Sequence, residues 1–263
     1  MKTIAEYDQE IRQNPNDAKL YNARGNAYAD EEDDDKAIAD FTKAIQLDPN
    51  YIGPYYNRGM TYYNIGDINS AITDLTKAMQ LEPNNAEICY IRGFVFLTGK
   101  KDFVLAIADF DQAIKINPNY TLAYYKRGIA YKVTDDYDRA IDDFSKVIQL
   151  DSSNANIYKD RGDAYCRKGD NSKAIMDYDQ AVRINPNYAE AYLARGMAYG
   201  IDSEQAIIDC ETALRLNLDN RLIESARGFL DATYKRLTAK KDLEGLTPKA
   251  IEALKNIEKM LGL

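Results

Sequence analysis

The sequence of 263 residues contains no histidine and no tryptophan. Without histidine, the chain cannot build a serine–histidine–aspartate or cysteine–histidine nucleophile, and it lacks the commonest metal ligand and acid–base catalyst near neutral pH. Its three cysteines, Cys89, Cys166 and Cys210, are too few for a disulfide framework and lack zinc-site spacing. We therefore expect no enzymatic activity, no cofactor and no metal. The cysteine content also favours a reducing, cytoplasmic compartment.

Long apolar segments and a basic surface are missing as well. No run approaches the ~18 apolar residues of a membrane span, and the N-terminal stretch MKTIAEYDQEIRQNP has no apolar core of a signal peptide. The 34 basic and 42 acidic residues give a net charge of -8. Because nucleic-acid binding depends on a basic surface, we expect neither a nucleic-acid partner nor membrane insertion.

What the sequence does contain is a repeat. The dipeptide arginine–glycine recurs with glycine spacings of 34, 34, 35, 34, 34 and 32 residues. The glycines are Gly25, Gly59, Gly93, Gly128, Gly162, Gly196 and Gly228. An aromatic residue follows each of the first six glycines by three positions, and an alanine opens a second half of each unit. Proline closes four units, at Pro49, Pro83, Pro118 and Pro186.

Each unit is expected to form two helices. In the second half of the first unit, Ala37, Ile38, Phe41, Ala44 and Ile45 fall on one helical stripe. The glycine and the alanines are small because two helices must approach closely there, and the proline ends the second helix. Since no single unit can bury its apolar face, stacked neighbours must share a continuous core.

This pattern resembles the tetratricopeptide repeat (TPR), W-x2-L-G-x2-Y…A-x3-F…P, with tyrosine for the tryptophan and arginine for the leucine. The resemblance implies an all-α, right-handed α-solenoid (superhelix) of six repeats, with an N-terminal half repeat and a C-terminal capping helix pair. We expect a single solenoid domain over residues 1–263. Its expected parts are a half repeat at 1–17, repeats at 18–51, 52–85, 86–120, 121–154, 155–188 and 189–220, and capping helices at 221–263.

Each repeat arginine has an aspartate on the second helix of its unit, 14 to 17 residues later. The candidate pairs are Arg24–Asp40, Arg58–Asp74, Arg92–Asp109, Arg127–Asp143, Arg161–Asp177 and Arg195–Asp209. They could offer a basic row to a ligand carboxylate. Because a planar guanidinium suits a carboxylate, we interpret them instead as structural pairs that bridge packed helices.

Three local features lead to further expectations. The acidic run Asp30–Asp35 could bind a cation or a basic partner, but it lacks EF-hand spacing, which favours a solvated turn. An extra residue in the third turn, LTGKKDF, predicts that Gly99 ends the first helix there. Cys166 stands beside the basic residues Arg167 and Lys168, which would lower the pKa of its thiol in a reactive role, but we interpret all three cysteines as unreactive.

In TPR families the first helices line a concave groove, where extended peptides or partner helices bind. The resemblance therefore implies a binding surface near each glycine, with an aromatic and apolar stripe in repeats two to four and basic residues after it. The predicted binding residues are Tyr56, Met60, Tyr63, Tyr90, Phe94, Tyr125, Lys126, Ile129, Lys159 and Arg167. The alternative is that these side chains only pack between neighbouring first helices.

These features predict a non-catalytic interaction module or adaptor that binds a peptide segment or helix of a partner protein in the concave groove. Basic residues at one end would fix the direction of an acidic segment. The alternative is a self-assembling structural scaffold that oligomerises through its repeat ends, because a bare second helix at residues 1–17 could accept another copy. We therefore expect a monomer or a homo-oligomer.

Overall fold

The computed structural model describes residues 2–200, 203–216, 220–239 and 247–261. Within these ranges the chain is helical and contains no strand. The helices are α1 (Ile4–Gln13), α2 (Ala18–Asp30), α3 (Asp34–Leu47), α4 (Ile52–Asn64), α5 (Ile68–Leu81), α6 (Ala86–Val95), η1 (Phe96–Lys100), α7 (Phe103–Ile116), α8 (Thr121–Val133), α9 (Tyr137–Leu150), α10 (Ala155–Arg167), α11 (Asn171–Ile184), α12 (Ala189–Tyr199), α13 (Glu204–Arg215), α14 (Asn220–Ala239) and α15 (Pro248–Leu261). In the described part, no helix is both long and apolar enough to cross a membrane.

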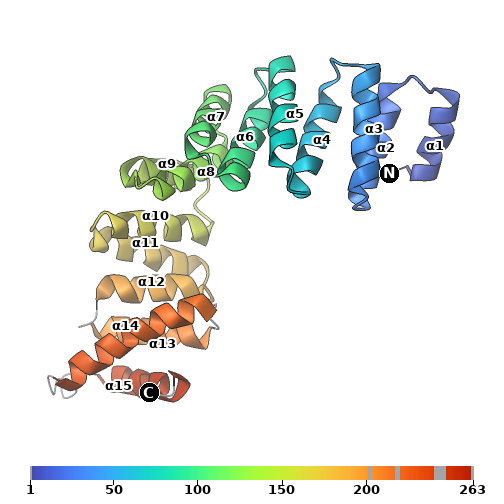
Figure 1. The fold of residues 1–263 in the computed structure, drawn as a ribbon. Helices are drawn as coiled ribbons and strands as arrows, with labels where there is room; N and C mark the ends of the chain where they lie inside the picture. The colour runs from blue at the N-terminus through green and yellow to red at the C-terminus, as the bar shows by residue number, and fades with distance from the viewer. Residues whose placement is uncertain (1, 201–202, 217–219, 240–246, 262–263) are drawn as a thin grey trace. The chain divides into compact units, whose positions relative to one another are not determined.

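The chain forms two compact units, Met1–Ala130 and Tyr131–Leu263. Within each unit, consecutive helices pack side by side (Figure 1). The pairs from α2–α3 to α12–α13 fall inside the predicted repeats, and α1 falls inside the predicted half repeat. The predicted all-α solenoid fold is thus confirmed. The division into a single domain with these repeat boundaries stays a prediction.

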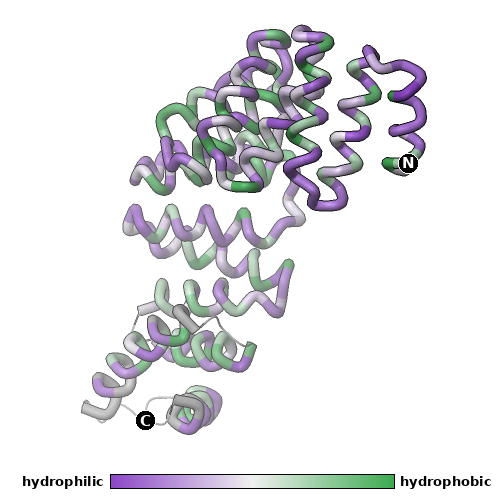
Figure 2. Tube along the Cα trace, turned by 45° about the vertical axis from the view of Figure 1, so that its right-hand side comes forward, coloured by the Kyte–Doolittle hydropathy of each residue, from purple (hydrophilic) through white to green (hydrophobic). Residues whose placement is uncertain are grey.

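The core lies between the paired helices of each repeat and continues to the first helix of the next repeat, as in the cluster of Tyr55, Ala78 and Ile88. Ala37, Phe41 and Ala44 on α3 are fully buried, and polar residues are interleaved with them along the helices (Figure 2). The motif glycine permits this close packing, since a Cβ on Gly25 would lie 2.6 Å from Cε1 of Phe41. The small residue is therefore required by the ring that fills the space beside it.

All five predicted arginine–aspartate pairs that lie within one unit are formed. In each, the arginine Nε and Nη2 donate to the two carboxylate oxygens at 2.7–2.8 Å. The aspartates, Asp40, Asp74, Asp109, Asp177 and Asp209, are only 1–6% exposed. The structural interpretation of these pairs is confirmed, because a guanidinium held in this way is already occupied on its forked edge.

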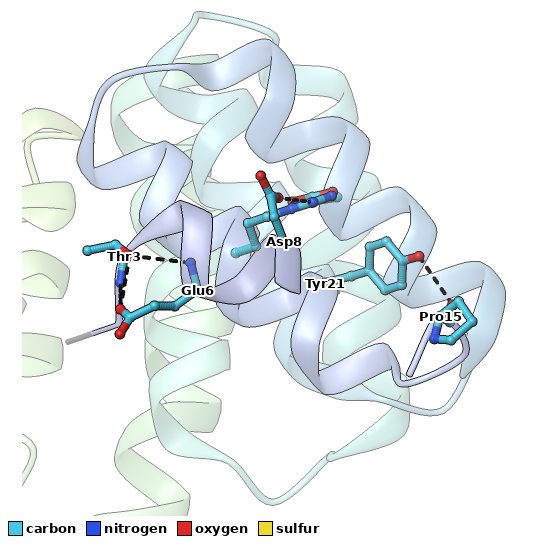
Figure 3. A network of polar contacts seen from close by, with 7 residues as sticks. Thr3, Glu6, Asp8, Pro15 and Tyr21 are labelled. Atoms are coloured by element: carbon cyan, nitrogen blue, oxygen red, sulfur yellow. Dashed lines mark hydrogen bonds and ion pairs between the residues drawn. The ribbon is translucent and has the colours of Figure 1, made fainter. Parts of the chain in front are cut away.

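The third guanidinium nitrogen, Nη1, reaches the preceding repeat. Arg58 donates to Thr42 Oγ1 at 2.7 Å, and Arg24 donates to Asp8 Oδ1 at 2.6 Å (Figure 3). In all six repeats the acceptor lies 16 residues before the arginine. The sequence analysis missed this contact, because the acceptor is an aspartate, a threonine or a serine in different repeats. Apart from Arg127, whose predicted aspartate lies in the other unit, each arginine therefore joins the second helices of two successive repeats.

Helix α1 is held by local hydrogen bonds as well (Figure 3). Thr3 and Glu6 form a capping box, in which the Thr3 N–H donates to Glu6 Oε2 at 2.7 Å and the Glu6 N–H donates to Thr3 Oγ1 at 3.3 Å. After the helix, the Tyr21 hydroxyl donates to the Pro15 carbonyl at 3.1 Å. The capping box thus holds the start of α1, and the Tyr21 hydroxyl ties the linker that follows the helix to α2.

An aspartate N-cap begins the second helix in five repeats. The caps are Asp33, Asp67, Asp102, Asp136 and Asp170, and each accepts from the backbone N–H three residues later. The acidic run of the first repeat contains the first of these caps, so part of its charge has a structural role. In the described residues, no group of three or more candidate ligands could hold a metal ion.

The third repeat corrects the expectation for Gly99. Helix α6 ends at Val95 and continues as the π-helical turn η1, and the left-handed residue after it is Lys101, with φ +56°. Gly99 lies inside the turn, where a Cβ would lie 2.8 Å from Cδ1 of Ile68. The extra residue is therefore absorbed by widening the helix, and Gly99 is small because α5 approaches it.

The predicted capping segment 221–263 is described except for 240–246 and 262–263, which lie outside the described residues, as do 201–202 and 217–219 of the predicted last repeat. Ala226 and Leu230 of α14 share one buried cluster with Ala253 and Leu254 of α15. Ile207 of α13 belongs to the same cluster. Both helices thus cover the apolar face of α13.

Candidate functional site

Eight of the ten predicted binding residues lie in the first unit, and all eight are half-buried. They are Tyr56, Met60 and Tyr63 on α4, Tyr90 and Phe94 on α6, and Tyr125, Lys126 and Ile129 on α8. These three helices are the first helices of successive repeats. We call the eight residues the aromatic stripe.

Phe94 connects the three helices of the aromatic stripe. Its ring meets that of Tyr63 edge to face, with centroids 5.7 Å apart, and stacks on Tyr90 at 6.4 Å. The Nζ of Lys126 lies 5.3 Å from the centroid of the same ring. These are favourable geometries for aromatic and cation–π contacts. The structure therefore brings the central members of the predicted site together.

Tyr90 also packs toward the interior. Its ring centroid lies 5.9 Å from that of Phe110 and 5.2 Å from that of Tyr120, and burial raises the pKa of its hydroxyl. The packing alternative thus holds in part, because Tyr90 fills space between neighbouring helices. Neither Tyr90 nor Phe94 is fully buried, however, so both rings keep accessible surface.

The hydroxyls of Tyr56 and Tyr63 in the aromatic stripe make hydrogen bonds to neighbouring helices. Tyr56 donates to Glu87 Oε1 at 3.1 Å, and burial together with that carboxylate raises the pKa of Tyr56 to about 12. The hydroxyls of Tyr63 and Thr98 lie 2.9 Å apart. A small cavity of about 180 Å³ adjoins Tyr56 and Glu87. The Tyr56 hydroxyl is therefore neutral near neutral pH, and the hydrogen bonds hold both rings in place.

Lys159 and Arg167 lie on α10, in the second unit. Lys159 Nζ lies 2.9 Å from Asp163 Oδ2, and Lys132 Nζ lies 2.5 Å from Asp160 Oδ1. Burial disfavours the charge of Lys159, but Asp163 and Asp160 outweigh it and raise its pKa. Arg167 is exposed and forms no ion pair with any described residue. Most of the predicted basic character of this region is thus balanced internally.

The cysteines are not activated. Burial and the charge of Asp163 raise the pKa of the Cys166 thiol despite nearby Arg167, which contradicts the reactive alternative and agrees with an unreactive thiol. Cys89 and Cys210 are fully buried, and burial raises the pKa of Cys210 to about 12. The sequence placed Cys166 beside positive charge and three residues after Asp163, but it did not reveal how far the thiol is buried.

Sequence reasoning also missed contributors in the linkers. Tyr120 packs against Tyr90, and Tyr51 accepts a hydrogen bond from Asn22 Nδ2 at 3.2 Å. Both tyrosines stand two residues after the proline that closes a repeat, as does Tyr188. That recurring position was a usable signal, because a side chain there reaches back over the preceding first helix.

Comparison with known families agrees with this architecture. A family model described as TPR repeat matches residues 25–66, 100–133 and 162–200, and one described as tetratricopeptide repeat matches 54–85 and 121–154. Together these matches cover more than half of the chain. No curated protein sequence matches it.

Solved structures resemble the chain over most of its length. YrrB, described as a TPR protein with an unusual peptide-binding site, has a TM-score of 0.63 at 25% identity, over 70% of this chain and 95% of that one. A MamA protein has a TM-score of 0.61 at 30% sequence identity, and the match covers 66% of this chain and 94% of that one. A tetratricopeptide repeat protein from Parabacteroides merdae shares the fold, with a TM-score of 0.60 at 22% sequence identity. The match covers 88% of this chain and 91% of that one. With its recurring motif and helix pairs, the chain belongs to the tetratricopeptide repeat family, whose members act as modules for protein–protein interaction.

Proposed function

We propose that this chain is a non-catalytic adaptor that binds a peptide segment or helix of a partner protein along its first helices. The aromatic stripe is the main docking surface. On the second unit, Arg167 is the predicted basic residue that remains to contact a partner, because Lys159 is paired with Asp163. The observation that carries the proposal is the half-buried ring network around Phe94, which joins α4, α6 and α8. The peptide-binding site described for YrrB supports it by similarity.

The physical chemistry of the aromatic stripe suits this role. Rings held by their neighbours offer a large apolar area and lose little side-chain entropy on binding. Each Å² of apolar surface covered contributes roughly 25 cal/mol before the ordering of the partner is counted. Lys126, over the Phe94 ring, supplies a cation for an acidic group of the partner. An apolar segment with acidic flanks therefore fits best.

The setting we propose is a reducing, cytoplasmic one. Cys89, Cys166 and Cys210 are all free thiols, which is typical of such a compartment. The lack of histidine supports a non-catalytic role, because the chain has no imidazole to activate a nucleophile.

A pull-down from native lysate tests the proposal, with the intact chain, a Phe94→Ala variant and a Val104→Ser control as baits. Val104 is an apolar residue of the same repeat, 77% exposed on the second helix α7. We expect the intact chain and the control to capture the same partner, and the Phe94→Ala variant to lose it at equal helicity. A partner retained by all three baits would refute the stripe as the binding site. Capture of further copies of the chain alone, with a concentration-dependent mass in light scattering, would favour the self-assembling scaffold.

A further inference from the structure

The second unit contains a pocket of about 480 Å³ at the C-terminal ends of α8 and α10. Its volume is within the range of about 300–1,000 Å³ that ligand pockets commonly have. Every residue that lines it belongs to the second unit. Val133, Cys166 and Met197 contribute apolar surface to it. We call it the α10 pocket.

Charged groups in and beside the α10 pocket are paired with protein groups. Asp163 accepts from the buried Tyr178 hydroxyl at 3.1 Å and from Lys159 at 2.9 Å, while Lys132 donates to Asp160 at 2.5 Å. Lys159 and Lys132 thus pair with Asp163 and Asp160, and Asp135, a further carboxylate of the lining, accepts from the Tyr137 hydroxyl. A ligand charge inserted among them would lose its water without gaining a free partner. The inserted part of the ligand must therefore be apolar.

Arg167 differs from the two lysines. It lines the same pocket, its side chain is exposed, and it forms no ion pair with any residue the structure describes. Its planar guanidinium carries five N–H donors in a fork that matches a carboxylate. The chemistry at this lining position therefore favours an anionic group beside the apolar one.

We propose that the α10 pocket binds an aliphatic side chain of a peptide segment, while Arg167 binds the carboxylate of an adjacent aspartate or glutamate. This inference rests on the proposed function, since it takes the occupant to be a peptide. It adds a second anchor on the second unit and states the chemistry of that anchor. Arg167 disfavours a basic group next to the aliphatic one, because it would face a like charge, while the Asp135 carboxylate is engaged by the Tyr137 hydroxyl.

The test uses the full chain and fluorescent hexapeptides with blocked ends, in which a leucine is followed by two glutamates. One comparison peptide replaces the leucine by alanine, and another replaces the glutamates by lysines. Binding is measured by fluorescence anisotropy. Cys166 serves as a native reporter of pocket occupancy, because it is partly accessible while Cys89 and Cys210 are fully buried. A bound peptide should slow the reaction of Cys166 with an aromatic disulfide reagent.

We expect the leucine–glutamate peptide to bind and to protect Cys166. The alanine peptide should bind at least about tenfold more weakly, because it removes apolar contact from the pocket. Arg167→Ala should weaken binding by about fivefold, as for an exposed ion pair, and high salt should remove that difference. Arg167→Glu should reverse the charge preference of the pocket, so that the lysine peptide binds better than the glutamate peptide.

Two exposed apolar residues of the second unit, Val133 and Met176, allow the same substitution to be made inside and outside the pocket lining. Val133 lines the α10 pocket and is 52% exposed, so Val133→Glu should abolish binding without disturbing the core. Met176, on α11 of the same unit, is 67% exposed and does not line the pocket, so Met176→Glu should bind like the intact chain. Equal effects of the two substitutions would overturn the proposal.

Other outcomes separate this inference from the proposed function. Equal binding of the glutamate and lysine peptides, or binding that leaves Cys166 unprotected, would overturn the assignment of the α10 pocket. No binding of any hexapeptide, while the aromatic stripe still captures a partner in the pull-down, would refute the pocket and leave the proposed function standing. Failure of both experiments would refute both.

Discussion

Removing the Arg92 guanidinium is the sharpest test of what holds successive repeats together. Its Nε and Nη2 donate to Asp109 at 2.8 and 2.7 Å, and its Nη1 donates to Thr76 at 3.1 Å in the preceding repeat. Asp109 is only 5% exposed. In an Arg92→Met variant, the Asp109 carboxylate would lose both of its charged donors while staying out of water.

The expected cost follows from that burial. Removing one partner of a buried ion pair destabilises a protein by about 3–5 kcal/mol, because an uncompensated charge is left behind. A folded protein has only about 5–15 kcal/mol to lose. Replacing both members by apolar residues, as in Arg92→Met with Asp109→Leu, removes the stranded charge. The double variant should therefore be less destabilised than the sum of the two single variants, by about 1–3 kcal/mol.

The assay is urea unfolding of the full chain followed by helical circular dichroism, from which the free energy of unfolding is obtained. Arg183→Met is the control, since Arg183 is exposed on α11, and it should change the free energy by no more than about 0.5 kcal/mol. If Arg92→Met costs no more than this control, or if the two single effects simply add, the pair does not hold the repeats in the way we argue.

Three further predictions concern packing and titration. Gly25→Ala would place a Cβ 2.6 Å from the Phe41 ring and should destabilise the fold by about 1–3 kcal/mol, whereas Gly228→Ala meets nothing within 4 Å and should be neutral or stabilising in thermal unfolding. Hydrogen bonds donated by the side chain and the backbone N–H of Ser70 lower the pKa of Asp67 in the folded state. The contribution of Asp67 to the free energy of unfolding should therefore be lost as the pH falls below about 4. In an Asp67→Asn variant, stability should depend less steeply on pH in this acid range. Burial raises the pKa of Tyr56 to about 12, so its contribution is present below pH of about 10 and should be lost as pH rises toward the folded value. A Tyr56→Phe variant whose alkaline unfolding curve matches that of the intact chain would contradict this last assignment.

Much of the fold could be predicted from the sequence because its cause is local and repeated. A period near 34 residues places the small residues and the rings at equivalent positions in every unit, so the pairing of Arg24 with Asp40 could be extended to later repeats. The second contact of each arginine was not visible in the same way. Thr42 and Asp8 differ in residue type, and they become equivalent only when successive second helices lie beside one another.

Part of the candidate site was also within reach of the sequence. The spacing of Tyr63, Tyr90 and Phe94 about the motif glycines predicted that they share a surface, and their rings do meet. The burial of Tyr90 against Tyr120 was out of reach, because Tyr120 stands in a linker outside the repeat motif. Whether the surface binds a partner depends on how much of each ring stays accessible to solvent, and the spacing of residues along the chain does not give that accessible area.

The sequence by itself determined the helical repeat, the small residues at close contacts and the arginine–aspartate pairs, since each follows from a regular spacing along the chain. Only the tertiary structure decided which charges are available to a partner. Lys132 and Asp160 are 28 residues apart in the chain, yet their charged groups lie 2.5 Å apart, while Arg167 keeps its fork of donors unengaged by the described residues. The physical reason is that the strength of an ion pair depends on distance and burial, and both are set by the packing of neighbouring helices.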